Sequence, residues 1–252
     1  MGRARKGTGD GAPARTPPRE PLLDEVETNP DKHILHGKNE ERARAIGAAT
    51  RFNAVECMPM IIQAVVEGER KGEKELEYEL LAALVGIDHT PEHLATVCGM
   101  LEKGDNAERL AAISILGAWG EPGSLTMDSL IGGLADADPE VVICSLGAIE
   151  TVAGFGHDCT SAKTPLLETF RRADSDLEER VLETLVEIGV NRDELVAECR
   201  LKDAAGDESR AIIRVEDAFS RCEEERRQTS IIKKKVLRLA ADILQETTRD
   251  GN

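Results

Sequence analysis

Residues Asp105 to Gly120 read DNAERLAAISILGAWG, and this stretch decides the fold of the chain. An Asp-Asn pair at its beginning and a glycine at its end are typical of the two caps of a helix. Between them Leu110, Ile113 and Leu116 recur at the helical period rather than with the alternation of a strand. The stretch therefore predicts one amphipathic helix.

Similar stretches recur along the chain, so this helix is one copy of a repeat. Asp138 opens DPEVVICSLGAIETVA, and Asp174 opens DSDLEERVLETLVEIG. Looser copies begin at Glu73 and Glu208. An apolar residue follows eleven positions after the first residue of each copy, at Leu84, Leu116, Ile149, Leu185 and Phe219. The spacings between these residues are 32, 33, 36 and 34 positions. Such a period predicts helix pairs that stack on one another and share a core.

The composition fits a helical protein. Of the 252 residues 40% are hydrophobic but only 2% are aromatic, so the core must be built mainly from Leu, Ile, Val and Ala. Side chains of this kind suit helix-on-helix packing. No run approaches eighteen apolar residues, so no membrane-spanning segment is expected. The basic first twenty residues contain no apolar core of a secretory signal, and a cytoplasmic location is expected.

Charge and cysteine usage narrow the functional classes. The net charge is −16, with 48 acidic and 32 basic residues, whereas a protein that grips phosphate backbones needs a basic face. Nucleic acid is therefore not an expected partner. None of the six cysteines forms a CxxC pair, and they are interpreted as small core residues in a reducing compartment.

Three segments are expected from the pattern. Residues 1–37 contain five prolines and no periodicity, which predicts a disordered N-terminal tail. Residues 38–225 form the repeat region, which begins with a helix over 38–53 whose Phe52 lies near the recurring apolar position. Residues 226–252 are expected to hold a C-terminal capping helix over 230–247 and a short tail. The basic run Lys233 to Lys235, with Arg238, is interpreted as the solvated face of that helix.

The second helix of each copy resembles that of a HEAT repeat. Asp138-Pro139-Glu140-Val141 matches the turn and helix start of the family pattern, and Arg109, Leu116 and Gly117 match its later positions. The resemblance implies an all-α fold, an α-α superhelix or solenoid of stacked antiparallel helix pairs, with second helices on the concave face. The sequence departs from the pattern in its short period and in keeping the family arginine only at Arg109. A tetratricopeptide repeat also has a short period, but its Trp, Gly and Tyr signature is absent.

Motifs for catalysis or metal binding are weak. His89-Thr90-Pro91-Glu92-His93 has the spacing of some zinc sites, but Thr90-Pro91 predicts a helix start between the two histidines. Asp136 to Glu140 lacks the glycine and the closing glutamate of a calcium loop. His157-Asp158-Cys159 is interpreted as an incidental loop triplet rather than a nucleophile with its base. No cofactor, metal or small-molecule ligand is expected, and the chain is predicted not to be an enzyme.

The remaining candidate site is a column of residues on the second helices. The fifth position after each turn and the position four residues later are expected to face the concave side, at Tyr78, Ala82, Leu110, Ser114, Ile143 and Gly147. These residues are apolar or small, whereas the column turns largely acidic in the next two copies, which place Glu179, Glu183, Ile213 and Asp217 there. A groove of this kind suits a partner helix or peptide. The alternative is that neighbouring helices bury the column.

The sequence thus predicts a protein-interaction scaffold or adaptor that binds another protein. Two other functions stay open at this point. One is a HEAT-like lyase or chaperone that acts on a protein-bound cofactor, and the other is a HEAT-like nucleic-acid binder.

Overall fold

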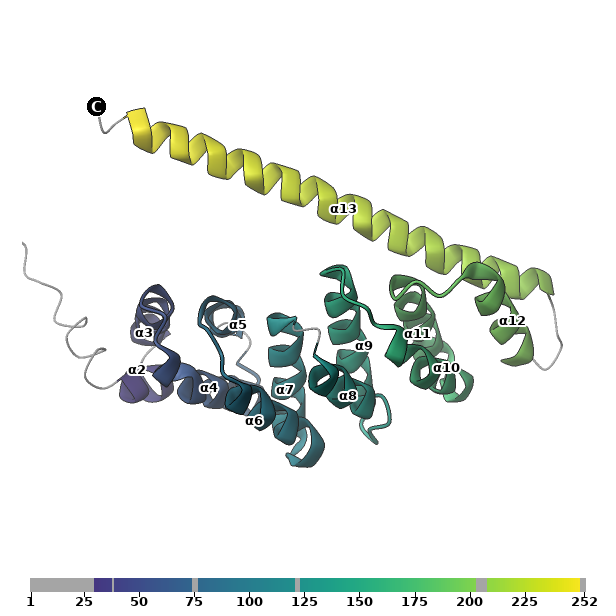
Figure 1. Cartoon of the computed structure of the whole chain (residues 1–252), viewed down its shortest axis with the longest axis horizontal. Coiled ribbons are helices and arrows are strands. Elements are labelled where there is room, and N and C mark those ends of the chain that lie inside the picture. Colours follow the sequence, from purple (N-terminus) through teal and green to yellow (C-terminus); the bar gives the residue numbers. More distant parts are fainter. Residues whose placement is uncertain (1–29, 38, 74–76, 121–122, 203–207, 250–252) are drawn as a thin grey trace, which may run out of the picture.

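The computed structural model describes residues 30–37, 39–73, 77–120, 123–202 and 208–249, the last range with side chains as far as residue 230. Within these ranges the protein is all-α, with twelve α-helices, two short 3-10 helices and no strand. The helices stack side by side into an elongated body (Figure 1), an arrangement compatible with a helical-repeat solenoid.

The helices form two layers (Figure 1). The first helix of each pair lies in one layer, and the second helix of each pair lies in the other. The first layer contains α2 (Pro30–His36), α4 (Met58–Lys71), α6 (Pro91–Lys103), α8 (Ser124–Gly133), α10 (Lys163–Arg172) and α12 (Arg192–Lys202). The second layer contains α3 (Asn39–Arg51), α5 (Glu77–Gly86), α7 (Asn106–Trp119), α9 (Pro139–Gly154), α11 (Ser175–Glu187) and α13 (Glu208–Arg249). The 3-10 helices Val55–Cys57 and Thr160–Ala162 precede α4 and α10.

The recurring aspartates start the second helices as expected. The Asp105 carboxylate accepts a hydrogen bond from the backbone N–H of Glu108, at 2.9 Å. Asp138 accepts one from the N–H of Glu140 at 2.9 Å, and Asp174 from that of Leu177 at 3.2 Å. Each bond satisfies one N–H group that the first turn of a helix leaves without a partner.

The apolar positions of the repeat lie in one continuous core. Leu84, Leu116, Ile149 and Leu185 are fully buried. Phe219 is only partly buried against the core, and Phe52, which lies just after the end of α3, is exposed. Arg109 of α7 connects two repeats, because its Nε lies 3.0 Å from the Asp136 carboxylate that precedes α9.

Helical structure begins earlier than the sequence predicted. The expected tail over 1–37 includes α2, in which Ile34 is fully buried, and Arg42 of α3 donates from Nε to the Ile34 carbonyl at 3.0 Å. Pro30 is the first residue of α2, where a proline costs no helical hydrogen bond. Residues 1–29 of that tail lie outside the described ranges.

The C-terminal end also differs from the prediction. The expected separate helices over 208–222 and 230–247 form one helix, α13, of 42 residues. The polar stretch between them contains neither glycine nor proline and is rich in Glu and Arg, which favour a helix. The side chains of Lys233 to Lys235 and Arg238 lie outside the described residues.

Candidate interaction surface

The uncovered large apolar residues of the second-layer helices lie on α5, α9 and α13. Ile212 and Ile213 of α13 are 37% and 59% exposed, but the charged helix α11 separates them from those of α5 and α9. Tyr78 and Val85 of α5 are 82% and 62% exposed, and Ala82 between them is also exposed. Ile143 of α9 is 48% exposed and Gly147 is half-buried. Since α7 packs between these two helices, its half-buried Ser114 lies between the two groups. We call Tyr78, Ala82, Val85, Ser114, Ile143 and Gly147 the open face.

Leu110 was expected in the same column, but the structure places it in the core. Only 9% of Leu110 is exposed, and it belongs to the buried cluster. The reason is the position of α7, which contacts α4, α5, α6 and α9 and so has little free surface. Val85 was missed, although Tyr78, Ala82 and Val85 follow the spacing of four and three residues that marks one side of a helix.

Gly147 has open space around it on the open face. A Cβ atom added to Gly147 would meet only the Arg180 guanidinium, at the ordinary contact distance of 3.9 Å. Small residues at such a position let the backbone of a second helix approach closely. The arrangement therefore offers two exposed apolar patches with a shallow centre of small residues between them.

The corresponding surface of α11 is charged and is covered by arginines. Arg221 of α13 lies 2.6 Å from Glu179 and 2.5 Å from Glu183. Arg226 lies 3.0 Å from Glu187, one turn further along both helices. The acidic column expected on α11 is therefore paired with cations from the next helix.

A buried carboxylate joins this charged surface to α9. Glu150 pairs with Arg180 of α11 and accepts a hydrogen bond of 2.6 Å from the Thr184 hydroxyl. Burial raises the pKa of Glu150 above its ordinary value, while the Thr184 hydrogen bond and the charge of Arg180 act in the opposite direction. Arg180 also lies 3.3 Å from Glu183, so three helices share one charge network.

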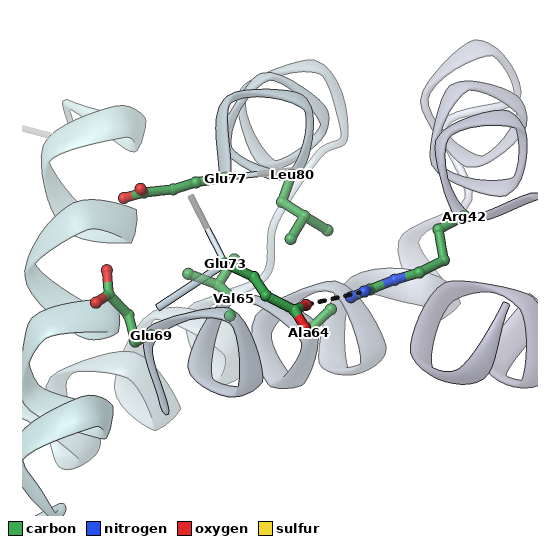
Figure 2. A pocket seen from close by; sticks show the side chains of 8 residues that line it. Arg42, Ala64, Val65, Glu69, Glu73, Glu77 and Leu80 are labelled. Carbon is green, nitrogen blue, oxygen red and sulfur yellow. Dashed lines mark ion pairs between the residues drawn. The ribbon is translucent and has the colours of Figure 1, made fainter. Parts of the chain in front are cut away.

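Two cavities among the described residues are lined by charged side chains that pair with one another. The hollow around Arg42 has a volume of about 10 Å³, which is room for about one water molecule. Figure 2 shows Arg42 extending toward Glu73, and the two groups lie 3.7 Å apart with Leu80 nearby. A larger cavity of about 320 Å³ lies between α11 and α13, where its carboxylates and guanidinium groups pair with one another.

The motifs that resembled metal or nucleophile sites have structural partners. The His93 Nδ1 accepts a hydrogen bond from the Thr90 N–H and so completes the cap of α6, whereas His89 stacks on Trp119 at 4.3 Å. In the described ranges no group of three or more His, Cys, Asp or Glu residues is arranged to hold a metal ion.

Two of the thiols, those of Cys159 and Cys222, lie in surroundings that oppose ionisation. Cys159 is buried, and burial raises its pKa with help from the neighbouring Asp158. Burial, together with the charges of Glu187 and Glu183, raises the pKa of Cys222 to about 12. Because the thiolate is the reactive form, these two cysteines are poor nucleophiles.

Comparisons with known proteins add no further constraint. No family model matches the chain, and a search of curated proteins also finds no match. Among the helices that the structure describes, none is both long and apolar enough to cross a membrane.

Proposed function

We propose that the protein is a non-enzymatic interaction scaffold whose open face binds an apolar helix or peptide of another protein. The observation that carries the proposal is the exposure of Tyr78 and Val85 on α5 and of Ile143 on α9, two second-layer helices on either side of α7. Large apolar side chains cost free energy when they stay exposed to water, and the apolar side of a partner helix would cover them.

The shape and chemistry of the open face favour a helical partner. Its long apolar side chains stand on α5 and α9, and Ser114 and Gly147 keep the middle shallow. A helix that presents residues at positions i, i+3, i+4 and i+7 can pack into such a surface. We further propose that the repeat is HEAT-like, which is supported by the Asp caps and by the link between Arg109 and Asp136.

The test begins by identifying what contacts the face. A photo-crosslinking phenylalanine analogue at Tyr78 should capture a partner protein, which mass spectrometry then identifies. The double variant Tyr78→Glu with Ile143→Glu should retain its fold and lose binding of that purified partner by at least about 100-fold, because two charges would be buried in an apolar contact.

The matched control is Leu201→Glu, which changes an exposed leucine on α12, away from the open face. It should bind the same partner with unchanged affinity. Unchanged binding by the double variant would refute the proposed face. A chromophore in the absorbance spectrum of the purified protein would instead favour the cofactor-handling alternative.

A further inference from the structure

The helix α13 continues well beyond the two helices that its first part contacts, and its later part runs back along the second-layer side of the body at a distance from it (Figure 1). That first part packs against α11 and α12. Its buried residues follow one another at spacings of four, three and four, at Ala211, Val215, Ala218 and Cys222. From Glu223 to Ser230 every residue is exposed, so Cys222 is the last residue of α13 in this range that the body buries.

The part of α13 that follows is long enough to need a partner. At about 1.5 Å per residue, the helix from Glu223 to Arg249 spans roughly 40 Å. A single helix is marginal in water, and most of the stability of a helix in a protein comes from packing its apolar side. A continuous helix of this length therefore points to a second element that packs along it.

The sequence of this extension carries the apolar series forward. Ile232, Val236, Leu239 and Ile243 are again separated by four, three and four positions. These residues continue the seven-residue repeat of the series that ends at Cys222. The two positions of the repeat between Cys222 and Ile232 are polar, Glu225 and Thr229. By register they occupy the a and d positions of a heptad repeat, which is the pattern of a helix that pairs with another helix.

We propose that residues 226–249 pair with the same segment of a second copy, as an antiparallel two-helix coiled coil. In the register we propose, position 236 lies beside position 239 of the other copy, and position 232 beside position 243. All four of these positions are apolar, so the central layers of the coiled coil contain no polar residue.

Charge complementarity selects this register. Lys235 and Asp242 occupy the g positions that flank the apolar layers, and in this register each lies beside the other across the dimer. A shift of one heptad in either direction would bring Lys235 beside Lys235, or Asp242 beside Asp242. A parallel pair would place Lys235 beside Ala240 and leave both charges without an opposite partner. The antiparallel arrangement forms the attractive pair twice by symmetry.

The test is the dimer dissociation constant of the full chain, measured by sedimentation velocity over a range of concentrations. Leu239→Asp should weaken the dimer by at least about 100-fold, because it places a charge in the central layer. Lys235→Asp and Asp242→Lys should each weaken it by about tenfold, since each creates two like-charge contacts. The double variant with both changes should return to within about threefold of the unmodified chain.

Lys234→Asp is the matched control, because position 234 lies on the side opposite the apolar layers, and it should leave the dimer unchanged. Circular dichroism checks that each variant keeps its helical body. A chain that stays monomeric at every concentration would overturn the proposal, as would a dimer in which the double variant fails to recover. None of these changes alters a residue of the open face, so each proposal is tested by its own variants and its own measurement.

Discussion

The two halves of the second layer differ in the side chains that they expose. We call α5 to α9 the first half and α9 to α13 the charged half. From α5 to α9 the surface presents Tyr78, Val85 and Ile143 to solvent. From α9 to α13 it presents mainly Glu and Arg side chains that pair across neighbouring helices, as Arg221 does with Glu183, and the exposed Ile212 and Ile213 lie on α13 beyond them. A surface already satisfied by its own ion pairs gains little from a partner, whereas exposed apolar side chains gain by being covered. The comparison therefore supports our proposal that a partner binds the first half, whereas the charged half packs against itself.

The largest expected effect is on the free energy of unfolding, and it distinguishes a buried position of the first half from an exposed one. Leu110→Glu should lower the free energy of unfolding by more than about 3 kcal/mol, because it buries a charge without a partner. Ile143→Glu, on the exposed side of α9, should change it by less than about 1 kcal/mol. Urea unfolding followed by circular dichroism measures both values. Similar losses in the two variants would show that Ile143 is covered in solution.

A smaller change in the free energy of unfolding is expected from a substitution in the charged half. Arg180→Met should lower the free energy of unfolding by about 1–2 kcal/mol, because it leaves the largely buried Glu150 with the Thr184 hydroxyl as a weaker partner. Arg227→Met is the control, since Arg227 and its partner Glu223 are both exposed at 3.4 Å, and should cost less than about 0.5 kcal/mol. Equal losses in the two variants would argue that the network on α9 and α11 adds no stability.

The sequence predicted the helices and their caps better than the surface. Asp105 and Asp138 act as caps because a capping bond depends on residues only two or three positions away. The burial of Leu110 could not be predicted in this way, because it depends on helices that contact α7 from several sides. The α2 helix was missed because its burial against the body, at His33 and Ile34, could not be read from a proline-rich stretch.

The same limit applies to the charged half. Glu179 and Glu183 were identified as an acidic column, but their pairing with Arg221 depends on how α13 lies along α11. No local pattern reveals that arrangement, since the paired residues are about forty positions apart in the sequence. Spacing along one helix predicts which residues share a side, and only the neighbouring helices decide whether that side is exposed.

The smallest expected effect concerns the pH dependence of stability. Because the pKa of Glu150 is raised in the folded state above its ordinary value of 4.5, the folded protein holds this proton more tightly than the unfolded chain. The contribution of Glu150 to stability is therefore fully present below about pH 4.5 and is lost as the pH rises through the folded-state pKa.

Glu150→Gln removes this titration and keeps an acceptor for Thr184. The variant should gain stability relative to the unmodified chain as the pH is raised from 4.5 to 7, by less than about 1 kcal/mol. Urea unfolding at several pH values measures the difference, with Glu168→Gln on the exposed side of α10 as a control that should show no such trend. A variant that instead loses stability with rising pH would show that attraction to Arg180 outweighs the cost of burying the carboxylate. The charged half would then be stabilised by its ion pairs rather than by the packing beneath them.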